Sequence, residues 1–274
     1  MKNIAKFYLS LFCIFGFEVM QASETVPFFL HREDGSFLEG YFLPPENTAA
    51  PIVFAIQGSS CESSLKWHED LSGQMRSLGL GLIVLEKQGI SKNEIDLFEY
   101  NQNNSLQKRH EDYVLCLNNL YAISPKWSGK IVFLGSSEGG MLAANLASQT
   151  PETAAILLFA TGGGMKPREE AKWAIQNRLE LHRAPQEEIQ EYMSCLDEQL
   201  DLMMFDPTPN KQFLGNTYQW WASLLNENEV SMLLSKNSLP IYLVHGVDDD
   251  KIPVHSADIA AELLKKQILL LTCV

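Results

Sequence analysis

The sequence predicts an α/β fold: a mostly parallel β-sheet covered by helices on both faces. Beyond Pro51 the chain contains six short, almost continuously apolar runs, at 52–58, 82–89, 131–137, 155–164, 241–246 and 268–274. Longer amphipathic stretches separate these runs, among them 66–78, 106–121, 139–149 and 256–266. Strands that are apolar on both sides are typical of parallel sheets, because the crossover helices cover both faces.

A β-hairpin is predicted before the first of these runs. Residues 26–45 hold two apolar-rich stretches on either side of Glu33-Asp34-Gly35-Ser36. Gly35 tolerates the positive φ that a tight turn requires. We therefore expect an N-terminal antiparallel hairpin.

A long interval separates the fourth and fifth apolar runs. Residues 165–239 are first charged and helical in pattern and then aromatic. One crossover helix does not need this length, so we expect an inserted subdomain of several helices that acts as a lid. Trp220 and Trp221 either pack this insertion on the main body or line a substrate pocket.

Composition and charge set the class of protein. A chain of 274 residues with 46% hydrophobic and 20% charged residues can bury one large core. The formal charge of −13 would repel nucleic acid and anionic membrane surfaces. We expect one globular domain, 23–274, that does not bind nucleic acid.

The N-terminus has the pattern of a secretory signal peptide. Lys2 and Lys6 precede an apolar run, 7–17, that is too short to span a bilayer, and cleavage after Ala22 is possible. No later apolar run is long enough to span a membrane. We therefore expect residues 1–22 to be removed and the mature protein to be exported, either to a periplasm or out of the cell.

Neither a metal nor another cofactor is expected. After signal removal the cysteines are 61, 116, 195 and 273, with no C-x-x-C spacing. The six histidines form no H-x-x-x-H pair and no cluster with the cysteines. The sequence does not determine any disulfide pairing.

The segment GSSEG, 135–139, fits the pattern G-x-S-x-G. It follows a predicted strand and precedes a predicted helix, which is the setting of a nucleophile elbow. Ser137 would project its hydroxyl at the carboxyl end of the sheet, on a helix N-terminus that favours developing negative charge. The alternative is a glycine-rich turn in which the serine only caps the helix.

With these elements the chain resembles the α/β-hydrolase family. HGVDDDKIP, 245–253, is similar to the segment of that family that carries the triad acid, and the spacing points to Asp249 rather than Asp248 or Asp250. An acid there orients an imidazole base. The alternative is an acidic turn that caps the helix beginning near His255.

The resemblance extends to a backbone oxyanion hole. AIQGSS, 55–60, is similar to the family's oxyanion segment, with Gln57 where many members have histidine. The resemblance implies that the backbone N–H groups of Ser59 and Glu138 hold the oxygen of a tetrahedral intermediate, although Ser60 is an alternative to Ser59. LEKQGIS, 85–91, is a degraded match to the family's next loop and receives no catalytic role.

The family's histidine base follows the last strand, and here that strand is the final run, 268–274. None of the six histidines matches this position, although His255 and His68 come nearest to it. We therefore expect a truncated chain with residual turnover, and an uncovered part of one sheet face where the family has a further helix.

The resemblance implies an exported serine hydrolase, esterase-like, that acts on a carboxylic ester or related small-molecule acyl substrate. Ser137 and Asp249 are its catalytic residues. Two alternatives stay open: a serine peptidase of the same fold, and a hydrolase-fold protein that binds a ligand or partner without catalysis.

Overall fold

The computed structural model describes residues 25–274 except 48, 126, 236–237, 266–267 and 274. The predicted signal peptide, 1–22, lies outside the described residues. No helix in the described part of the chain is long and apolar enough to cross a membrane.

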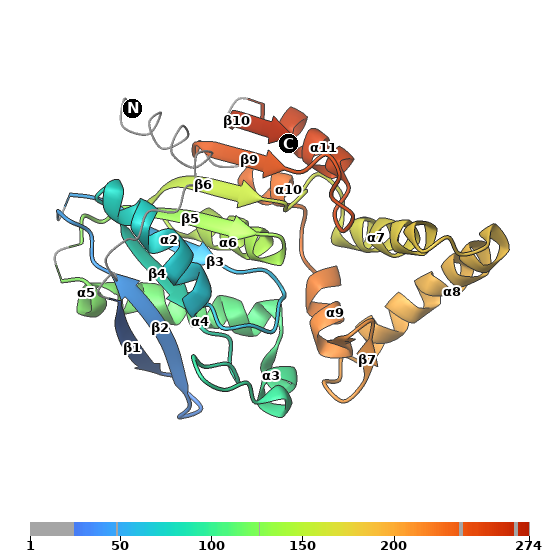
Figure 1. The fold of residues 1–274 in the computed structure, drawn as a ribbon, viewed down its shortest axis with the longest axis horizontal. Helices are drawn as coiled ribbons and strands as arrows, with labels where there is room; N and C mark the ends of the chain where they lie inside the picture. The colour runs from blue at the N-terminus through green and yellow to red at the C-terminus, as the bar shows by residue number, and fades with distance from the viewer. Residues whose placement is uncertain (1–24, 48, 126, 236–237, 266–267, 274) are drawn as a thin grey trace.

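An eight-stranded sheet forms the centre of the molecule (Figure 1), with strands β1 Val26–His31, β2 Phe37–Leu43, β3 Ile52–Ile56, β4 Gly81–Leu85, β5 Ile131–Ser136, β6 Thr153–Phe159, β9 Ile241–His245 and β10 Ile268–Cys273. Their order is β1-β2-β4-β3-β5-β6-β9-β10. β1 pairs antiparallel with β2, β2 pairs antiparallel with β4, and all other neighbours are parallel. The prediction of a mostly parallel sheet is confirmed.

The helices of the main body are α2 Leu65–Ser77, α3 Leu97–Asn103, α4 Leu106–Asn118, α5 Leu120–Ile123, α6 Glu138–Gln149 and α11 Val254–Leu263. α2, α4 with α5, α6 and α11 correspond to the predicted amphipathic stretches, whereas α3 was not among them. The predicted single helix 106–121 is divided into α4 and α5, because Asn119 ends α4 with a ψ of 9° and begins the next turn.

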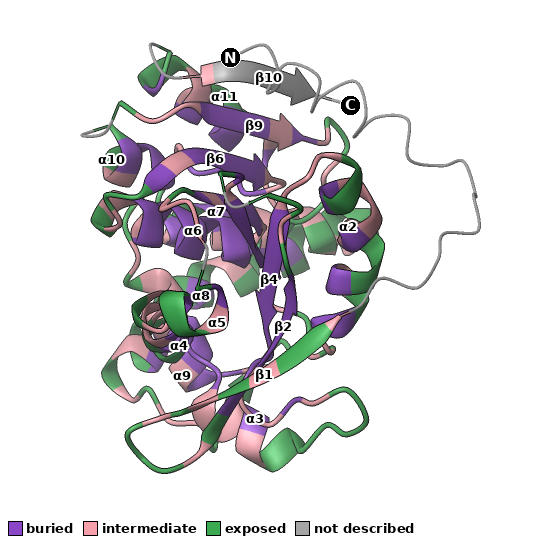
Figure 2. Cartoon of the chain, turned by 90° about the vertical axis from the view of Figure 1, so that its left-hand side faces the viewer, coloured by how far each residue is buried: buried purple, intermediate pink, exposed green. Residues whose placement is uncertain are grey.

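Two apolar clusters join the sheet to these helices. On one face, Phe54, Phe133 and Ile156 pack with residues of α4, α6 and α11. On the other face, Val53, Ala55 and their neighbours pack against α2. The sheet is thus covered on both faces, and Figure 2 contrasts its buried inner strands with the largely exposed β1.

The face that carries α2 is incompletely filled in the described structure. A hollow of about 530 Å³ is lined by sheet residues that include Val132, Ala155 and Leu157. It lies beside the end of α2, at Ser77 and Leu78. The expected uncovered part of the sheet beside the last strand stays a prediction.

The segment between β6 and β9 contains α7 Pro167–Leu181, α8 Gln186–Phe205, α9 Tyr218–Leu225, α10 Val230–Leu234 and the short strands β7 Gln212–Phe213 and β8 Asn216–Thr217. We call residues 165–239 the insertion. Its helices α7 and α8 extend away from the sheet (Figure 1), around a small apolar cluster of their own that includes Leu196, Leu200 and Trp221. α10 packs on α6 through Val230 and Leu234, so the insertion is joined to the body at both of its ends.

The first end of the insertion is anchored by a buried polar cluster. Ser256 of α11 donates to the carboxylate of Glu170 in α7, which also accepts the N–H of Gly163 at 3.1 Å. The Ser256 hydroxyl accepts the N–H groups of Gly164 and Met165 at 3.0 and 3.1 Å. Burial raises the pKa of Glu170 to about 7.

Candidate active site

Ser137 occupies a sharp turn between β5 and α6. Its φ is 53° and its ψ is −127°, a strained conformation for a residue other than glycine. The N–H of Ser137 donates to the carbonyl of Phe159 at 2.9 Å, which fixes the turn against β6. Strain of this kind persists only when the surrounding structure determines it.

The glycines of the motif are required by close backbone contacts. A Cβ on Gly139 would lie 2.1 Å from the carbonyl oxygen of Ile56, and a Cβ on Gly135 would lie 2.3 Å from the carbonyl oxygen of Gly139. No side chain fits at these distances. Both glycines therefore allow α6 to pack directly on β3 and β5.

The Ser137 hydroxyl is not used to cap α6. Ser137 stands at the N-cap position, but its side chain makes no capping hydrogen bond. The side chain is partly exposed. The interpretation of this serine as a simple helix cap is therefore not supported, and the hydroxyl is available at the N-terminus of α6.

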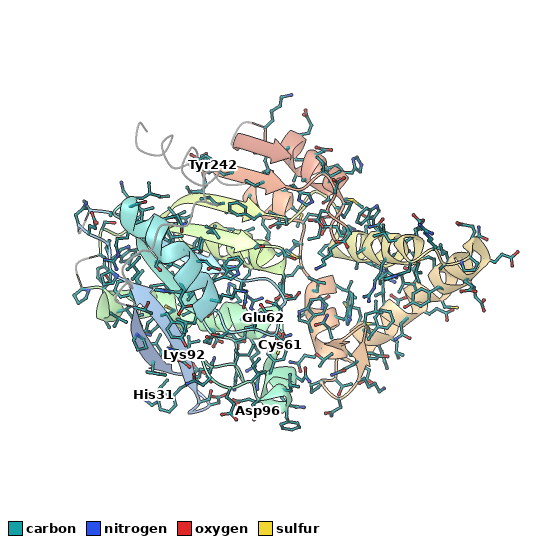
Figure 3. All side chains as sticks on the ribbon, in the orientation of Figure 1. His31, Cys61, Glu62, Lys92, Asp96 and Tyr242 are labelled. Atoms are coloured by element: carbon teal, nitrogen blue, oxygen red, sulfur yellow. The ribbon has the colours of Figure 1, made fainter. Side chains whose placement is uncertain are left out.

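The loop after β3 lies against Ser137. A Cβ on Gly58 would lie 3.3 Å from Cβ and 3.9 Å from Oγ of Ser137. We call residues 57–60 the β3 loop. Its backbone thus lies beside the serine. Cys61, next along the chain, lies at the carboxyl end of the sheet (Figure 3).

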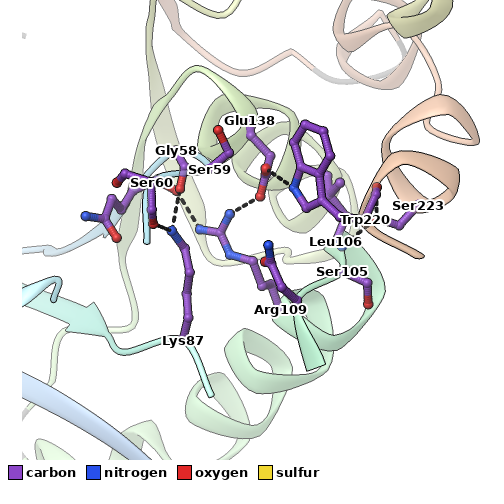
Figure 4. A network of polar contacts seen from close by, with 12 residues as sticks. Gly58, Ser59, Ser60, Lys87, Ser105, Leu106, Arg109, Glu138, Trp220 and Ser223 are labelled. Carbon is purple, nitrogen blue, oxygen red and sulfur yellow. Dashed lines mark hydrogen bonds and ion pairs between the residues drawn. The ribbon is translucent and has the colours of Figure 1, made fainter. Parts of the chain in front are cut away.

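The side chain of Glu138 is the centre of a buried polar network (Figure 4). It is 4% exposed and forms an ion pair with Arg109 of α4, which is 5% exposed. Its second oxygen accepts the indole N–H of Trp220 at 2.7 Å. Arg109 also donates to the carbonyl of Gln57 in the β3 loop. One guanidinium therefore contacts both segments to which the resemblance gives a role in an oxyanion hole.

Trp220 and Trp221 both take packing roles. Trp220 reaches the main body through Glu138, whereas Trp221 donates to the carbonyl of Phe213 at 2.8 Å inside the insertion. Both rings are buried. The first of the two interpretations, that they pack the insertion, agrees with these contacts.

Asp249 lies in the turn after β9 and differs from its neighbours. Its side chain is 14% exposed, while Asp248 and Asp250 are exposed. One carboxylate oxygen accepts the N–H groups of Lys251 and Ile252 at 2.9 and 3.0 Å. Asp249 thus stabilises the turn in which it lies. It does not cap α11, because Pro253 occupies the N-cap position of that helix and no side chain caps it.

The histidines do not complete a triad within the described residues. His245 lies 3.6 Å from the second oxygen of Asp249, but it is 2% exposed and its Nε2 lies 3.1 Å from the carbonyl of Ile252. His68 is fully buried in α2 beside Tyr41, and burial lowers its pKa to about 4. His255 is exposed in the first turn of α11. No hydrogen bond joins a described histidine to Ser137.

Sequence reasoning did not identify Arg109 as part of this site. The signal was the buried face of α4, where Leu106, Arg109, Tyr113 and Cys116 recur at helical spacing. A charge on an apolar stripe requires a buried partner.

In the part of the chain that the structure describes, no group of three or more His, Cys, Asp or Glu side chains is arranged to hold a metal.

Solved structures of known proteins share this arrangement of elements. An esterase from Pyrococcus furiosus is 14% identical, with a TM-score of 0.59 over 92% of this chain and 81% of that one. Mouse alpha/beta hydrolase domain-containing protein 10 is 17% identical, with a TM-score of 0.55 over 90% of this chain and 88% of that one. An acylaminoacyl peptidase from Pyrococcus horikoshii is 14% identical, with a TM-score of 0.59 over 93% of this chain but 37% of that one. No protein-family profile and no curated protein sequence matches the chain.

Proposed function

We propose that this chain, which has the α/β-hydrolase fold, is a serine hydrolase that cleaves a carboxylic ester or a related acyl substrate. The observation that carries the proposal is the conformation of Ser137, which sits at positive φ on a helix N-terminus with the β3 loop backbone beside it. This arrangement serves nucleophilic attack with stabilisation of an oxyanion.

The proposed chemistry assigns a role to each residue of the site. The hydroxyl of Ser137 attacks the acyl carbon, and its proton passes to a base and then to the leaving alcohol. The N–H groups of Ser59 and Glu138 hold the oxygen of the tetrahedral intermediate. Water then releases the acid from the acyl-enzyme. Asp249 orients the base. The resemblance places that base after β10, and we assign none of the described histidines to it.

The substrate class follows from the fold and its relatives by analogy. The similar P. furiosus protein is an esterase, and the P. horikoshii one is an acylaminoacyl peptidase of which this chain spans about a third. We therefore favour small esters over peptides. In this proposal the insertion is a lid over Ser137, and residues 1–22 direct export and are removed.

The alternative function is ligand binding without catalysis. The contact between His245 and Asp249 favours it, because His245 is buried and its Nε2 faces a backbone carbonyl rather than Ser137. A protein of this kind would be stabilised by a ligand that it never turns over.

A fluorophosphonate probe with intact-mass analysis tests the proposal. Wild-type protein is expected to gain one adduct, and the Ser137→Ala variant is expected to gain none. An adduct that survives in Ser137→Ala, or its absence from folded wild-type protein, would contradict the proposed nucleophile and leave the binding function as the better account.

A further inference from the structure

Four consecutive carbonyl groups of the β3 loop accept hydrogen bonds from side chains. Gln57 accepts from Arg109, Gly58 accepts from Lys87 at 2.7 Å, Ser59 accepts from Tyr100 at 3.2 Å, and Ser60 accepts from Lys87. Loop carbonyls usually face water. Here they are bound by three side chains from three separate segments of the chain.

Lys87 is the central donor of this set. It lies two residues after the end of β4, is 6% exposed, and contacts the carbonyls on both sides of Ser59. Burial lowers its pKa to about 7, because desolvation disfavours the charged form. Figure 4 shows Lys87 and Arg109 approaching the β3 loop from the same side.

Arg109 connects this loop to the residue after the serine. One arm of its guanidinium binds the carbonyl of Gln57, and the other binds the carboxylate of Glu138. The planar fork of arginine fixes the two partners relative to each other. A single rigid group therefore links the backbone of the β3 loop to the side chain of the residue after Ser137.

Because each peptide unit is planar, a hydrogen bond that fixes a carbonyl of the loop also fixes the direction of the next residue's N–H group. A carbonyl and the N–H of the next residue point in opposite directions across a trans peptide. A Gly58 carbonyl bound to Lys87 thus turns the Ser59 N–H away from Lys87. Gly58 also lies against Ser137, so the orientation of this peptide decides what a substrate at Ser137 would meet.

We propose that Lys87, Arg109 and Tyr100 are positioning residues for the oxyanion hole, which hold the β3 loop by its carbonyls so that the Ser59 N–H faces the reacting oxygen. The proposal rests on the proposed function, because only a hydrolase uses that N–H. The three side chains act through the backbone and do not touch the substrate.

Lys87→Met is the first test, because methionine retains much of the volume and removes the donors. Phosphonylation of Ser137 by a fluorophosphonate is followed by intact mass over a range of probe concentrations, which separates kinact from KI. We expect kinact to fall about 10- to 100-fold with KI nearly unchanged, since a displaced oxyanion donor weakens the transition state more than binding. Lys87→Arg is expected to recover part of this loss.

The matched control is Lys92→Met, which removes an exposed lysine five positions along the chain. It is expected to react at the wild-type rate. Tyr100→Phe is the second variant in case Lys87→Met does not fold. It removes one hydroxyl, and we expect a several-fold fall in kinact.

Crystal structures of the wild type and of the folded variant give a readout that does not depend on activity. In Lys87→Met, or in Tyr100→Phe if the first variant is unfolded, the Ser59 amide nitrogen is expected to shift by about 1 Å, enough to matter for catalysis. An unchanged β3 loop together with an unchanged kinact would overturn the positioning role. If wild-type protein forms no adduct, the proposed function fails by itself, and the loop shift alone then decides whether these side chains hold the backbone.

Discussion

The indole N–H of Trp220 donates a 2.7 Å hydrogen bond to the buried carboxylate of Glu138. Trp220 belongs to α9 of the insertion, and Glu138 is the first residue of α6. The contact therefore joins the insertion to the turn that carries Ser137. A displacement of Trp220 would therefore act on Glu138, the residue next to Ser137.

Trp220→Phe is expected to destabilise the protein by about 1–3 kcal/mol, because it leaves one oxygen of a buried carboxylate without its donor. Urea unfolding measures the loss. Trp221→Phe is the matched control, since it removes a hydrogen bond inside the insertion and leaves Glu138 untouched. We expect protease sensitivity of the junction between α9 and the body to rise in Trp220→Phe only. Equal sensitivity in both variants would contradict the coupling.

Arg109→Met is expected to cost about 3–5 kcal/mol, because it leaves Glu138 as an uncompensated buried charge. Arg168 provides the comparison, since its ion pair with Asp197 lies on the surface, with side chains 32% and 51% exposed. Arg168→Met is expected to cost less than about 1 kcal/mol. The two free energies of unfolding are measured by urea titration at one pH. Similar losses would mean that the Arg109 pair is effectively solvated.

Local patterns in the sequence were sufficient to predict the sheet and the Ser137 turn. Continuous apolar runs such as 131–134 specify buried parallel strands, and Gly135 and Gly139 mark a close backbone approach. Both signals lie within short segments of the chain, so a single sequence is enough to recognise them. The order of the strands and the positive φ of Ser137 were not predicted and come from the structure.

The network behind the turn was not predictable in the same way. Lys87 and Arg109 come from different segments and converge on the β3 loop only in three dimensions. The segment 85–91 is a degraded match to the family's loop and therefore gave Lys87 no role. Lys87 nevertheless lies only two residues after a buried strand, where a charged side chain is seldom buried without a partner. Asp249 could be chosen among three aspartates by spacing, but its burial and its backbone partners required the structure.

Gly139→Ala is expected to destabilise the fold by at least about 3 kcal/mol, because the new Cβ would collide with the backbone carbonyl of Ile56 and only a backbone shift relieves it. Gly129→Ala is the control for glycine removal as such. Gly129 has a φ of 78° and open space around it, so its substitution is expected to cost about 1–2 kcal/mol of backbone strain alone. Thermal or urea unfolding compares the two. A Gly139→Ala variant as stable as Gly129→Ala would contradict the packing of α6 on β3.

The anchor at Glu170 predicts a pH dependence of stability. Burial raises the pKa of its carboxyl from 4.5 to about 7, against the opposing effect of hydrogen bonds from Ser256 and Gly163. The folded protein therefore keeps a proton at Glu170 that the unfolded chain releases between about pH 4.5 and pH 7. The unfolded state binds fewer protons in this window, so the free energy of unfolding falls as the pH rises through it. The loss is complete above the folded pKa and amounts to at most about 3 kcal/mol.

Glu170→Gln removes this dependence, because the amide stays neutral and its oxygen still accepts from Ser256. The difference in free energy of unfolding between variant and wild type is expected to shift in favour of the variant by up to about 3 kcal/mol from pH 4 to pH 8. Glu169→Gln, on the exposed neighbouring residue, controls for the loss of one carboxyl from α7. Urea titrations at several pH values test this directly. Parallel pH curves for wild type and Glu170→Gln would show that Glu170 ionises in the folded protein as it does in the unfolded chain, and that the anchor tolerates a charge.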